Sequence, residues 1–111
     1  EVEVVIHAFI EKIYEKELDI SRKIPLVKNC VYHLYWICVK NRNIFRKKLL
    51  EQGIETGTHY KPIHNLSYYH KKSVKLPVTE KISKEIVTIP IHPNLSDADI
   101  DKIITTVNKF A

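Results

Sequence analysis

The chain has 111 residues, of which 44% are hydrophobic and 28% charged, with a formal net charge of +5 at pH 7. This size and balance are typical of one globular domain and exclude two lobes with a cleft between them. No run approaches the roughly 20 apolar residues of a membrane span, and the acidic start EVEVVIHAFI is unlike a signal peptide, so we expect a cytoplasmic protein and no membrane partner.

The first half of the chain predicts a helix, a strand and a second helix. Apolar residues recur at helical spacing over residues 2–18, which predicts an amphipathic helix. The stretch VYHLYWICV, residues 31–39, is rich in β-branched and aromatic residues and predicts a central strand. Asn41 is placed to cap the next helix, and Gly53 is expected to end it in the left-handed conformation that glycine adopts without strain.

Residues 54–60, IETGTHY, predict a second short strand with Gly57 inside it. A glycine within a strand is typical either of a β-bulge or of a backbone that something else approaches closely, and both interpretations stay open here. Pro62 then begins an irregular segment that continues to about residue 76. A loop of this length in a small domain is more often functional than passive.

The last third predicts a short helix, a strand and a terminal helix. Thr79 can cap the short helix, and residues 86–91 (IVTIPI) predict the third strand. Ser96 and Asp99 have the spacing of a capping box at the start of the terminal helix. The predicted fold is therefore an α/β two-layer sandwich, with a small, mainly antiparallel three-stranded sheet and helices packed mostly on one face.

The irregular segment and the residues just before it concentrate polar aromatic side chains. They are His59, Tyr60, His64, Tyr68, Tyr69 and His70. The three histidines are five and six residues apart, which fits neither the helical nor the strand spacing of a metal site, so no metal is expected. The imidazole and phenol groups, together with the ammonium groups of the lysines, suit hydrogen bonding to a polyhydroxylated, phosphorylated small molecule. Packing and solvation of a long loop would explain the same residues.

Positive charge gathers in the same region. From residue 59 to residue 75 the chain has four lysines and no acid: Lys61, Lys71, Lys72 and Lys75. Such a run indicates either a solvated loop or a loop that attracts phosphate. The sequence contains no zinc-finger pattern, no RNA-recognition signature and no long basic stripe, so we do not expect a nucleic-acid partner.

Three stretches carry a more specific pattern: HLYWICVKNR, LLEQGIETGTHYKPIH and LPVTEKISKEIVTIPIHPNLSDADIDKII. They resemble the C-terminal domain of the DegT/StrS sugar-nucleotide aminotransferases, where GIxTGxHY leads into H-[YF]-x-P-x-H, an LP pair, a short helix, a strand with LP or IP, and a helix opened by L-[ST]-[DE]. The matching residues are Gly53, Ile54, Thr56, Gly57, His59, Tyr60, Pro62, His64, Leu76, Pro77, Ile89, Pro90, Pro93, Leu95, Ser96 and Asp97. The resemblance runs from about residue 11 to residue 110.

The resemblance implies that residues 1–111 are the small domain of a larger pyridoxal-phosphate (PLP) enzyme of the aspartate aminotransferase fold. In that family PLP forms a Schiff base with a lysine of the large N-terminal domain, and an aspartate there pairs with the pyridinium nitrogen. No segment of this chain resembles that domain, so the resemblance implies an isolated chain without catalytic or cofactor-binding residues. The parent would be a homodimer that converts a nucleotide-linked keto-sugar to an amino-sugar with glutamate as donor, although some relatives perform dehydration.

The same resemblance suggests roles for residues of this chain. His59 and Tyr60 would face the nucleotide-sugar, with His64 nearby on the same loop, and Gly57 would let the strand pass close to the substrate. Lys61 stands where relatives more commonly have proline, so it could add a phosphate contact or loosen the loop.

The resemblance also leaves alternatives open. Cys38 stands where many relatives have a basic residue, which weakens the idea that this strand contacts an anion. A stand-alone anion-binding module without catalysis and a structural interaction module that only packs are the other two interpretations.

Overall fold

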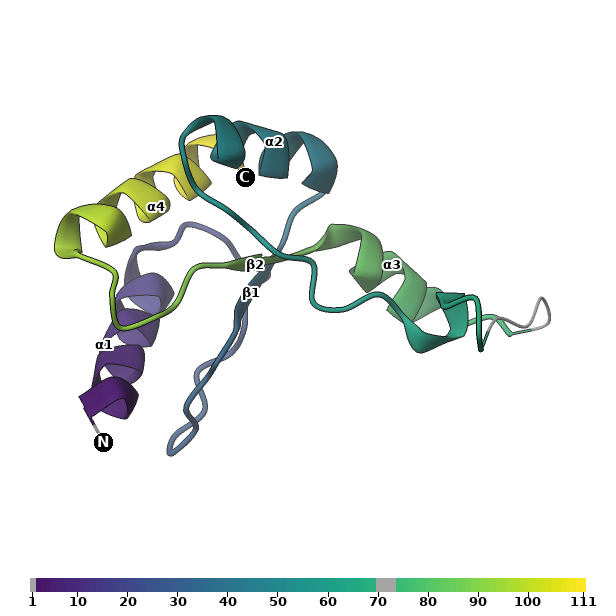
Figure 1. The fold of residues 1–111 in the computed structure, drawn as a ribbon, viewed down its shortest axis with the longest axis horizontal. Helices are drawn as coiled ribbons and strands as arrows, with labels where there is room; N and C mark the ends of the chain where they lie inside the picture. Colours follow the sequence, from purple (N-terminus) through teal and green to yellow (C-terminus); the bar gives the residue numbers. More distant parts are fainter. Residues whose placement is uncertain (1, 70–73) are drawn as a thin grey trace.

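Four α-helices and a two-stranded sheet make up the part of the chain that the computed structural model describes, residues 2–69 and 74–111. In chain order the elements are α1 (Val2–Glu17), β1 (Tyr35–Cys38), α2 (Arg42–Glu51), the short 3-10 helix η1 (Ile63–Asn65), α3 (Pro77–Glu85), β2 (Ile86–Ile89) and α4 (Asp97–Phe110). Figure 1 shows their arrangement around the strands. The predicted α/β class is confirmed. No described helix is long and apolar enough to cross a membrane.

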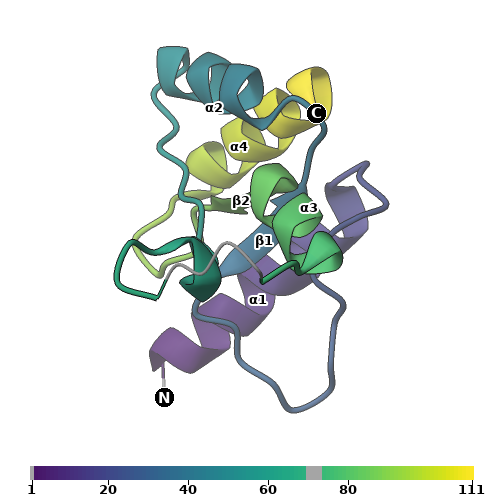
Figure 2. The ribbon, with the colours of Figure 1, turned by 90° about the vertical axis from the view of Figure 1, so that its right-hand side faces the viewer.

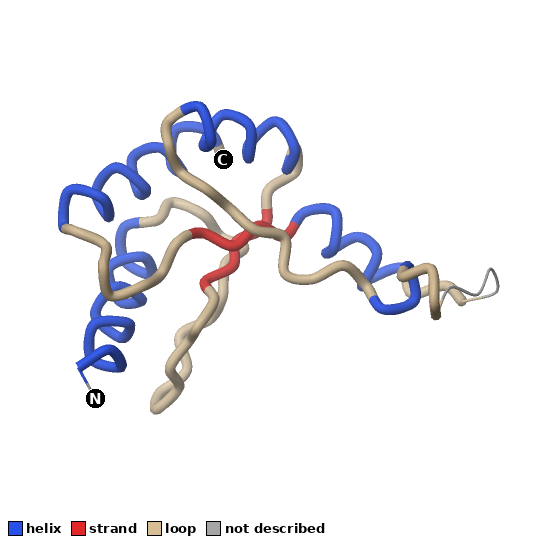
Figure 3. The backbone as a smooth tube through the Cα atoms, viewed as in Figure 1, coloured by secondary structure: helices blue, strands red, loops and turns tan. Residues whose placement is uncertain are grey.

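The two strands form an antiparallel pair at the centre of the molecule (Figure 3). They pair along their whole length, with Tyr35 opposite Ile89 at one end. The strand predicted for residues 31–39 begins only at Tyr35, because the N–H of Tyr32 donates to the carboxylate of Glu11 (2.7 Å) and not to a neighbouring strand.

The strand predicted for residues 54–60 is wrong: it is reduced to one bridge, in which Gly57 and Thr88 exchange two backbone hydrogen bonds of 2.9 and 3.0 Å. In an antiparallel pair the next such exchange would come two residues away on each side. On one side it would need Pro90, which has no N–H. On the other side it would need Ile86, whose N–H already bonds to the last turn of α3. Pairing therefore stops after one residue, and the predicted three-stranded sheet has only two strands.

The end of α2 follows the sequence prediction. Gly53 has φ = 79°, the left-handed conformation expected of it. Its N–H donates to the carbonyl of Leu50, and the N–H of Ile54 donates to the carbonyl of Leu49, both at 2.9 Å. These two bonds form a Schellman motif, and the side chains of Leu49 and Ile54 are buried beside it.

Two of the three N-cap positions predicted from the sequence are confirmed. The capping box of α4 is present, with Asp99 N–H donating to Ser96 Oγ (3.1 Å) and Ser96 N–H donating to Asp99 Oδ2 (2.9 Å). Asn41 stands at the N-cap of α2, but its side chain makes no capping bond. The cap predicted at Thr79 is wrong, because α3 begins at Pro77, whose fixed φ and missing N–H suit the first turn of a helix.

The core lies between the two strands and three of the helices. Its buried members are Ile10, Tyr14 and Leu18 of α1, Tyr35 and Ile37 of β1, Phe45 and Leu49 of α2, Val87 and Ile89 of β2, Ile100, Ile103, Ile104 and Val107 of α4, and Ile24, Val39, Ile54 and Ile91 of the connections. Tyr14 packs edge-on against Tyr35, with ring centroids 5.1 Å apart, and its hydroxyl donates to the carbonyl of Pro90 (2.6 Å). We call this part, which comprises α1, α2, α4, β1 and β2, the body.

Residues 58–69 and 74–85 form a separate arm that contains η1 and α3. The arm projects away from the body in Figure 1, and Figure 2 looks onto it. No described residue of the arm is buried, whereas every element of the body contributes to the core. The arm accounts for the elongated shape of the molecule, which measures 47 × 32 × 24 Å. The helix α3 therefore lies in the arm and not on the sheet. The predicted two-layer sandwich, with helices packed mostly on one face of the sheet, is not confirmed.

Candidate functional site

The residues singled out in the sequence lie along the first half of the arm and at its junction with the body. Gly57 lies at the edge of β2, and His59, Tyr60 and Lys61 follow it, while His64 lies in η1. The structure brings two of them together, since the rings of His59 and Tyr60 meet edge-on at 4.8 Å. His64 makes its contacts with α3. His70, Lys71 and Lys72, also singled out, lie outside the described residues.

His59 is held by a residue of the sheet. Its Nδ1 lies 2.8 Å from the hydroxyl oxygen of Thr88, which is buried in β2. A Cβ atom at Gly57 would lie 2.6 Å from Thr88 Oγ1 and 2.7 Å from His59 Nδ1, closer than packed atoms approach. The chain's own His59 and Thr88 therefore occupy the space beside Gly57. Thr88 was not anticipated, although it is the one polar residue in the apolar stretch IVTIPI.

The residues after His59 are open to solvent. Tyr60 is 72% exposed, and Lys61 is exposed as well. Lys61 lines a shallow recess of about 630 Å³ together with Tyr68 and Tyr69, whose rings meet edge-on at 5.0 Å. An ammonium group and two exposed phenols thus lie on one face of the arm, where each can hydrogen-bond to a ligand.

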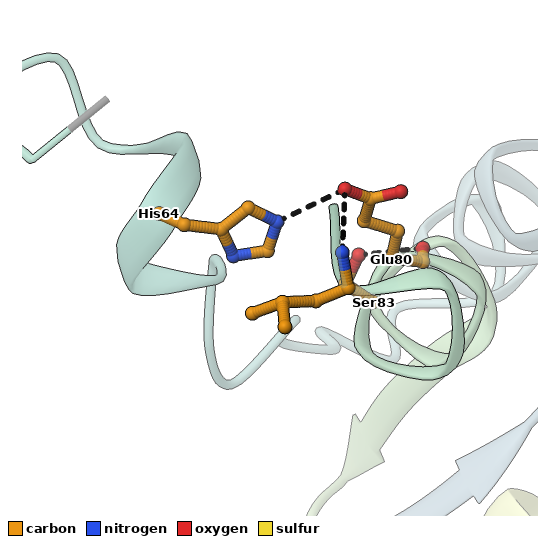
Figure 4. A network of polar contacts seen from close by, with 4 residues as sticks. His64, Glu80 and Ser83 are labelled. Carbon is orange, nitrogen blue, oxygen red and sulfur yellow. Dashed lines mark hydrogen bonds and ion pairs between the residues drawn. The ribbon is translucent and has the colours of Figure 1, made fainter. Parts of the chain in front are cut away.

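His64 and Glu80 join η1 to α3 (Figure 4). His64 Nε2 lies 3.1 Å from Glu80 Oε1, and the same oxygen accepts a longer bond of 3.4 Å from the N–H of Leu76. Figure 4 also shows Ser83, whose hydroxyl donates to the backbone carbonyl of Glu80 (2.8 Å). These bonds hold the pKa of the Glu80 carboxyl below its usual range, the bond from His64 being the largest cause and that from Leu76 the next. Glu80 was missed because it lies 16 residues after His64.

A small recess of about 210 Å³ lies where the arm leaves the body. His59, Gly57 and Thr88 line it together with His33 and Glu55, which the sequence did not single out. His33 comes from the segment just before β1 and Glu55 from the segment after α2. In the described part of the chain no three His, Cys, Asp or Glu side chains lie close enough to hold a metal ion.

A second basic recess lies on the body, away from the predicted site. Its volume is about 530 Å³, and its lining includes Arg22, Cys38, Lys40 and Lys48. Arg22 forms an ion pair of 2.6 Å with Glu85, which is the main cause of the lowered pKa of that carboxyl. Burial raises the pKa of the Cys38 thiol despite the nearby guanidinium. A buried, protonated thiol is a weak nucleophile and a weak ligand for anions, so Cys38 contributes little to this recess beyond packing.

The described residues do not fit a PLP site. A lysine that forms a Schiff base needs a free amine in a protected pocket, and among the described lysines none is buried. Lys23 is the least exposed of them, and its ammonium donates to the backbone carbonyls of Glu15 (2.8 Å) and Leu18 (2.9 Å). We therefore derive no step of PLP chemistry from this chain.

Comparison with known proteins shows that one sequence family matches nearly the whole chain. The model of the DegT/DnrJ/EryC1/StrS aminotransferase family matches residues 7–108. A dTDP-3-amino-3,6-dideoxy-alpha-D-galactopyranose transaminase from Aneurinibacillus thermoaerophilus is 34% identical over 82 residues, which are 72% of this chain and 23% of that protein.

Solved structures agree with this match. A DegT DnrJ EryC1 StrS aminotransferase from Brucella abortus is 31% identical and superposes with a TM-score of 0.86 over 97% of this chain and 31% of its own. A candidate sugar aminotransferase from Streptococcus pneumoniae, solved in its PLP form, is 26% identical and has a TM-score of 0.82 over 97% of this chain and 31% of its own. The chain therefore spans about a third or less of the length of these relatives.

Proposed function

The chain belongs to the DegT/DnrJ/EryC1/StrS aminotransferase family, and we propose that it is the C-terminal small domain of a PLP-dependent enzyme that makes an amino-sugar from a nucleotide-linked keto-sugar. The observation that carries this proposal is the match of the fold, over 97% of this chain, to aminotransferases about three times as long. The substrate class follows from the transaminase of Aneurinibacillus thermoaerophilus, whose name specifies a dTDP-linked amino-sugar.

In this proposal the arm binds the nucleotide-sugar. His59 and Tyr60 hydrogen-bond to it, His64 lies nearby on the same loop, and Lys61 attracts its phosphates. Exposed phenol and ammonium groups, with the partly buried imidazoles of His59 and His64, support this role, because they match the hydroxyl and phosphate oxygens of such a substrate. Gly57 contributes indirectly, through the space that it leaves for His59.

The remaining two thirds of the parent enzyme would supply the chemistry. PLP, when bound there, supplies an electron sink for transfer of the amino group, and glutamate is the proposed donor. A homodimer is proposed because the arm has large exposed side chains, among them Ile63, Tyr68 and Val78, that need a covering surface. We place the enzyme in the cytoplasm, where nucleotide-sugars are available.

The proposal is tested in the enzyme that contains this chain. His59→Ala removes one hydrogen bond, which is worth about 0.5–1.5 kcal/mol to a hydroxyl and about 1.5–3 kcal/mol to a charged phosphate. We expect kcat/KM for the nucleotide-sugar to fall roughly 10- to 100-fold while the absorbance of bound PLP is unchanged. Tyr60→Phe should cost less, because the ring keeps its packing. Lys61→Ala should raise KM, and more so at low salt.

Two results would contradict the proposal. If His59→Ala abolishes the half-reaction with glutamate, His59 serves the cofactor chemistry and the arm is not a sugar-binding segment. If the 111-residue chain alone binds one PLP per molecule, and borohydride fixes it to a single lysine, the chain is not an incomplete part of a larger active site.

A further inference from the structure

We propose that Thr88 and Gly57 are positioning residues that hold His59 in one tautomer, so that His59 presents its Nε2–H as a hydrogen-bond donor to an oxygen atom of the substrate. The inference rests on the proposed function, since it explains how His59 would bind the sugar. Three observations support it: the bond of 2.8 Å between His59 Nδ1 and Thr88 Oγ1, the burial of Thr88, and the absence of a side chain at Gly57.

The hydroxyl of Thr88 is fixed by the sheet. Thr88 lies inside β2, and both of its backbone groups on the outer edge of that strand bond to Gly57. Thr88 lies opposite Trp36 of β1 in the register of the sheet, and its own N–H and carbonyl both bond to Gly57, so its side chain is attached to a backbone with a neighbour on each edge. His59, on the exposed arm, takes its orientation from this rigid point.

The environment of Thr88 determines which nitrogen of His59 carries the proton. The Thr88 hydroxyl is buried, and its side-chain partner among the described residues is His59 Nδ1. A buried hydroxyl that leaves its proton unpaired costs more than one that leaves a lone pair unpaired. The hydroxyl therefore donates to Nδ1, which is then the acceptor nitrogen of a neutral imidazole, and the proton is on Nε2.

This arrangement gives the same donor in both charge states of the ring. When His59 is protonated, Nδ1 also carries a hydrogen, and the Thr88 hydroxyl can rotate to accept from it. Nε2–H remains a donor in either case. Nε2 makes no hydrogen bond to any residue in the described ranges, and the ring borders the recess of about 210 Å³. A free N–H at that position recognises an oxygen acceptor, which in a nucleotide-sugar is a hydroxyl, carbonyl or phosphate oxygen.

Gly57 makes the arrangement sterically accessible. A Cβ there would contact both the imidazole and the Thr88 hydroxyl. Because a Cβ would lie within 3 Å of both groups, they cannot both stay in place, and we expect Gly57→Ala to separate His59 from Thr88. Gly53 offers a matched comparison, since a Cβ at Gly53 meets nothing closer than Lys102 Nζ at 3.9 Å. Gly53→Ala should therefore strain the backbone without affecting His59.

The tautomer can be measured without substrate or cofactor. In the 111-residue chain with 15N-labelled histidine rings, the His59 signals at neutral to alkaline pH should show an unprotonated Nδ1 and a protonated Nε2. Thr88→Val, which keeps the shape and removes the hydroxyl, should give a mixture of tautomers, and Thr88→Ser should restore the single form. A wild-type ring protonated at Nδ1, or the same tautomer in wild type and Thr88→Val, would overturn the proposal. Gly57→Ala, which should resemble Thr88→Val, provides a second, independent variant.

Kinetics of the enzyme that contains the chain separate this inference from the proposed function. Thr88→Val should lower kcat/KM for the nucleotide-sugar roughly 2- to 10-fold, Thr88→Ser should recover it, and Thr88→Val should have no further effect in a His59→Ala background. If His59→Ala itself has no effect on turnover, the proposed function of the arm fails whatever the tautomer. If His59→Ala lowers turnover and Thr88→Val does not, the positioning role fails and the function stands.

Discussion

The body and the arm of this molecule are ordered by different interactions. Each helix of the body places large apolar side chains in the shared core, as Leu49 does from α2. The arm contains an equally regular helix, α3, but its apolar residue Val78 is 77% exposed. The bonds that organise the arm are polar: Glu80 accepts from His64 and Leu76, and Glu85 at the end of α3 forms an ion pair with Arg22 of the body. Burial thus stabilises the body, and the arm depends on hydrogen bonds until another surface covers it.

The largest expected effect tests this difference directly. Leu49→Ala should lower the free energy of unfolding by about 2–5 kcal/mol, because it leaves a cavity in a fully buried site. Val78→Ala removes a similar apolar group from the arm and should change it by less than about 0.5 kcal/mol. Urea denaturation of the 111-residue chain measures both. Comparable losses would mean that α3 packs on the body in solution and that the arm is not separate.

The sequence predicted those parts of the fold that depend on neighbouring residues. The Schellman end at Gly53 and the capping box of Ser96 and Asp99 involve residues within a few positions of one another, so their spacing was readable. The strand predicted for residues 54–60 was wrong for a reason outside its own residues, since Pro90 and Ile86 could not pair with it. A strand pattern in the sequence describes one segment only. Pairing also requires a second segment whose backbone N–H and carbonyl groups are not already hydrogen-bonded.

The candidate site shows the same limit. His59 and His64 were found because polar aromatic residues cluster in the sequence, but their partners were not. Thr88 lies 29 residues from His59, and Glu80 lies 16 residues from His64. Nothing local to either histidine indicates these contacts, because they form only when β2 and α3 fold back beside the loop.

A smaller effect tests whether side-chain hydrogen bonds also stabilise the body. Ser96→Ala removes the capping bond of α4 and should cost about 0.5–2 kcal/mol of unfolding free energy. Asn41→Ala is the matched control, because Asn41 stands at the N-cap of α2 without a side-chain capping bond, and it should change stability by less than about 0.5 kcal/mol. Thermal or urea unfolding distinguishes the two. Equal losses would show that the Ser96 bond contributes nothing specific.

The smallest effect concerns the pH dependence of the arm. In the folded chain the pKa of Glu80 lies below its ordinary value of 4.5, chiefly because of the bond from His64. A carboxyl whose pKa is lower in the folded chain than in the unfolded chain stabilises the folded form at any pH above its unfolded pKa. This stabilisation is lost as the pH falls through the folded pKa. Acid should therefore loosen η1 from α3 only below about pH 4.5.

Hydrogen exchange of the α3 amides, compared between pH 6 and pH 3 after correction for the intrinsic rate, should report this opening. Glu80→Gln keeps an oxygen that accepts from His64 and Leu76 but has no charge to lose, so its α3 should show no additional opening in acid. Asp99→Asn is the control in the body, since the pKa of Asp99 is also lowered, mainly by the backbone bond from Ser96. It should remove acid sensitivity from α4 and leave that of α3 unchanged. If α3 opens in acid as much in Glu80→Gln as in wild type, the bond between His64 and Glu80 does not organise the arm, and the covering surface proposed for the parent enzyme must do so alone.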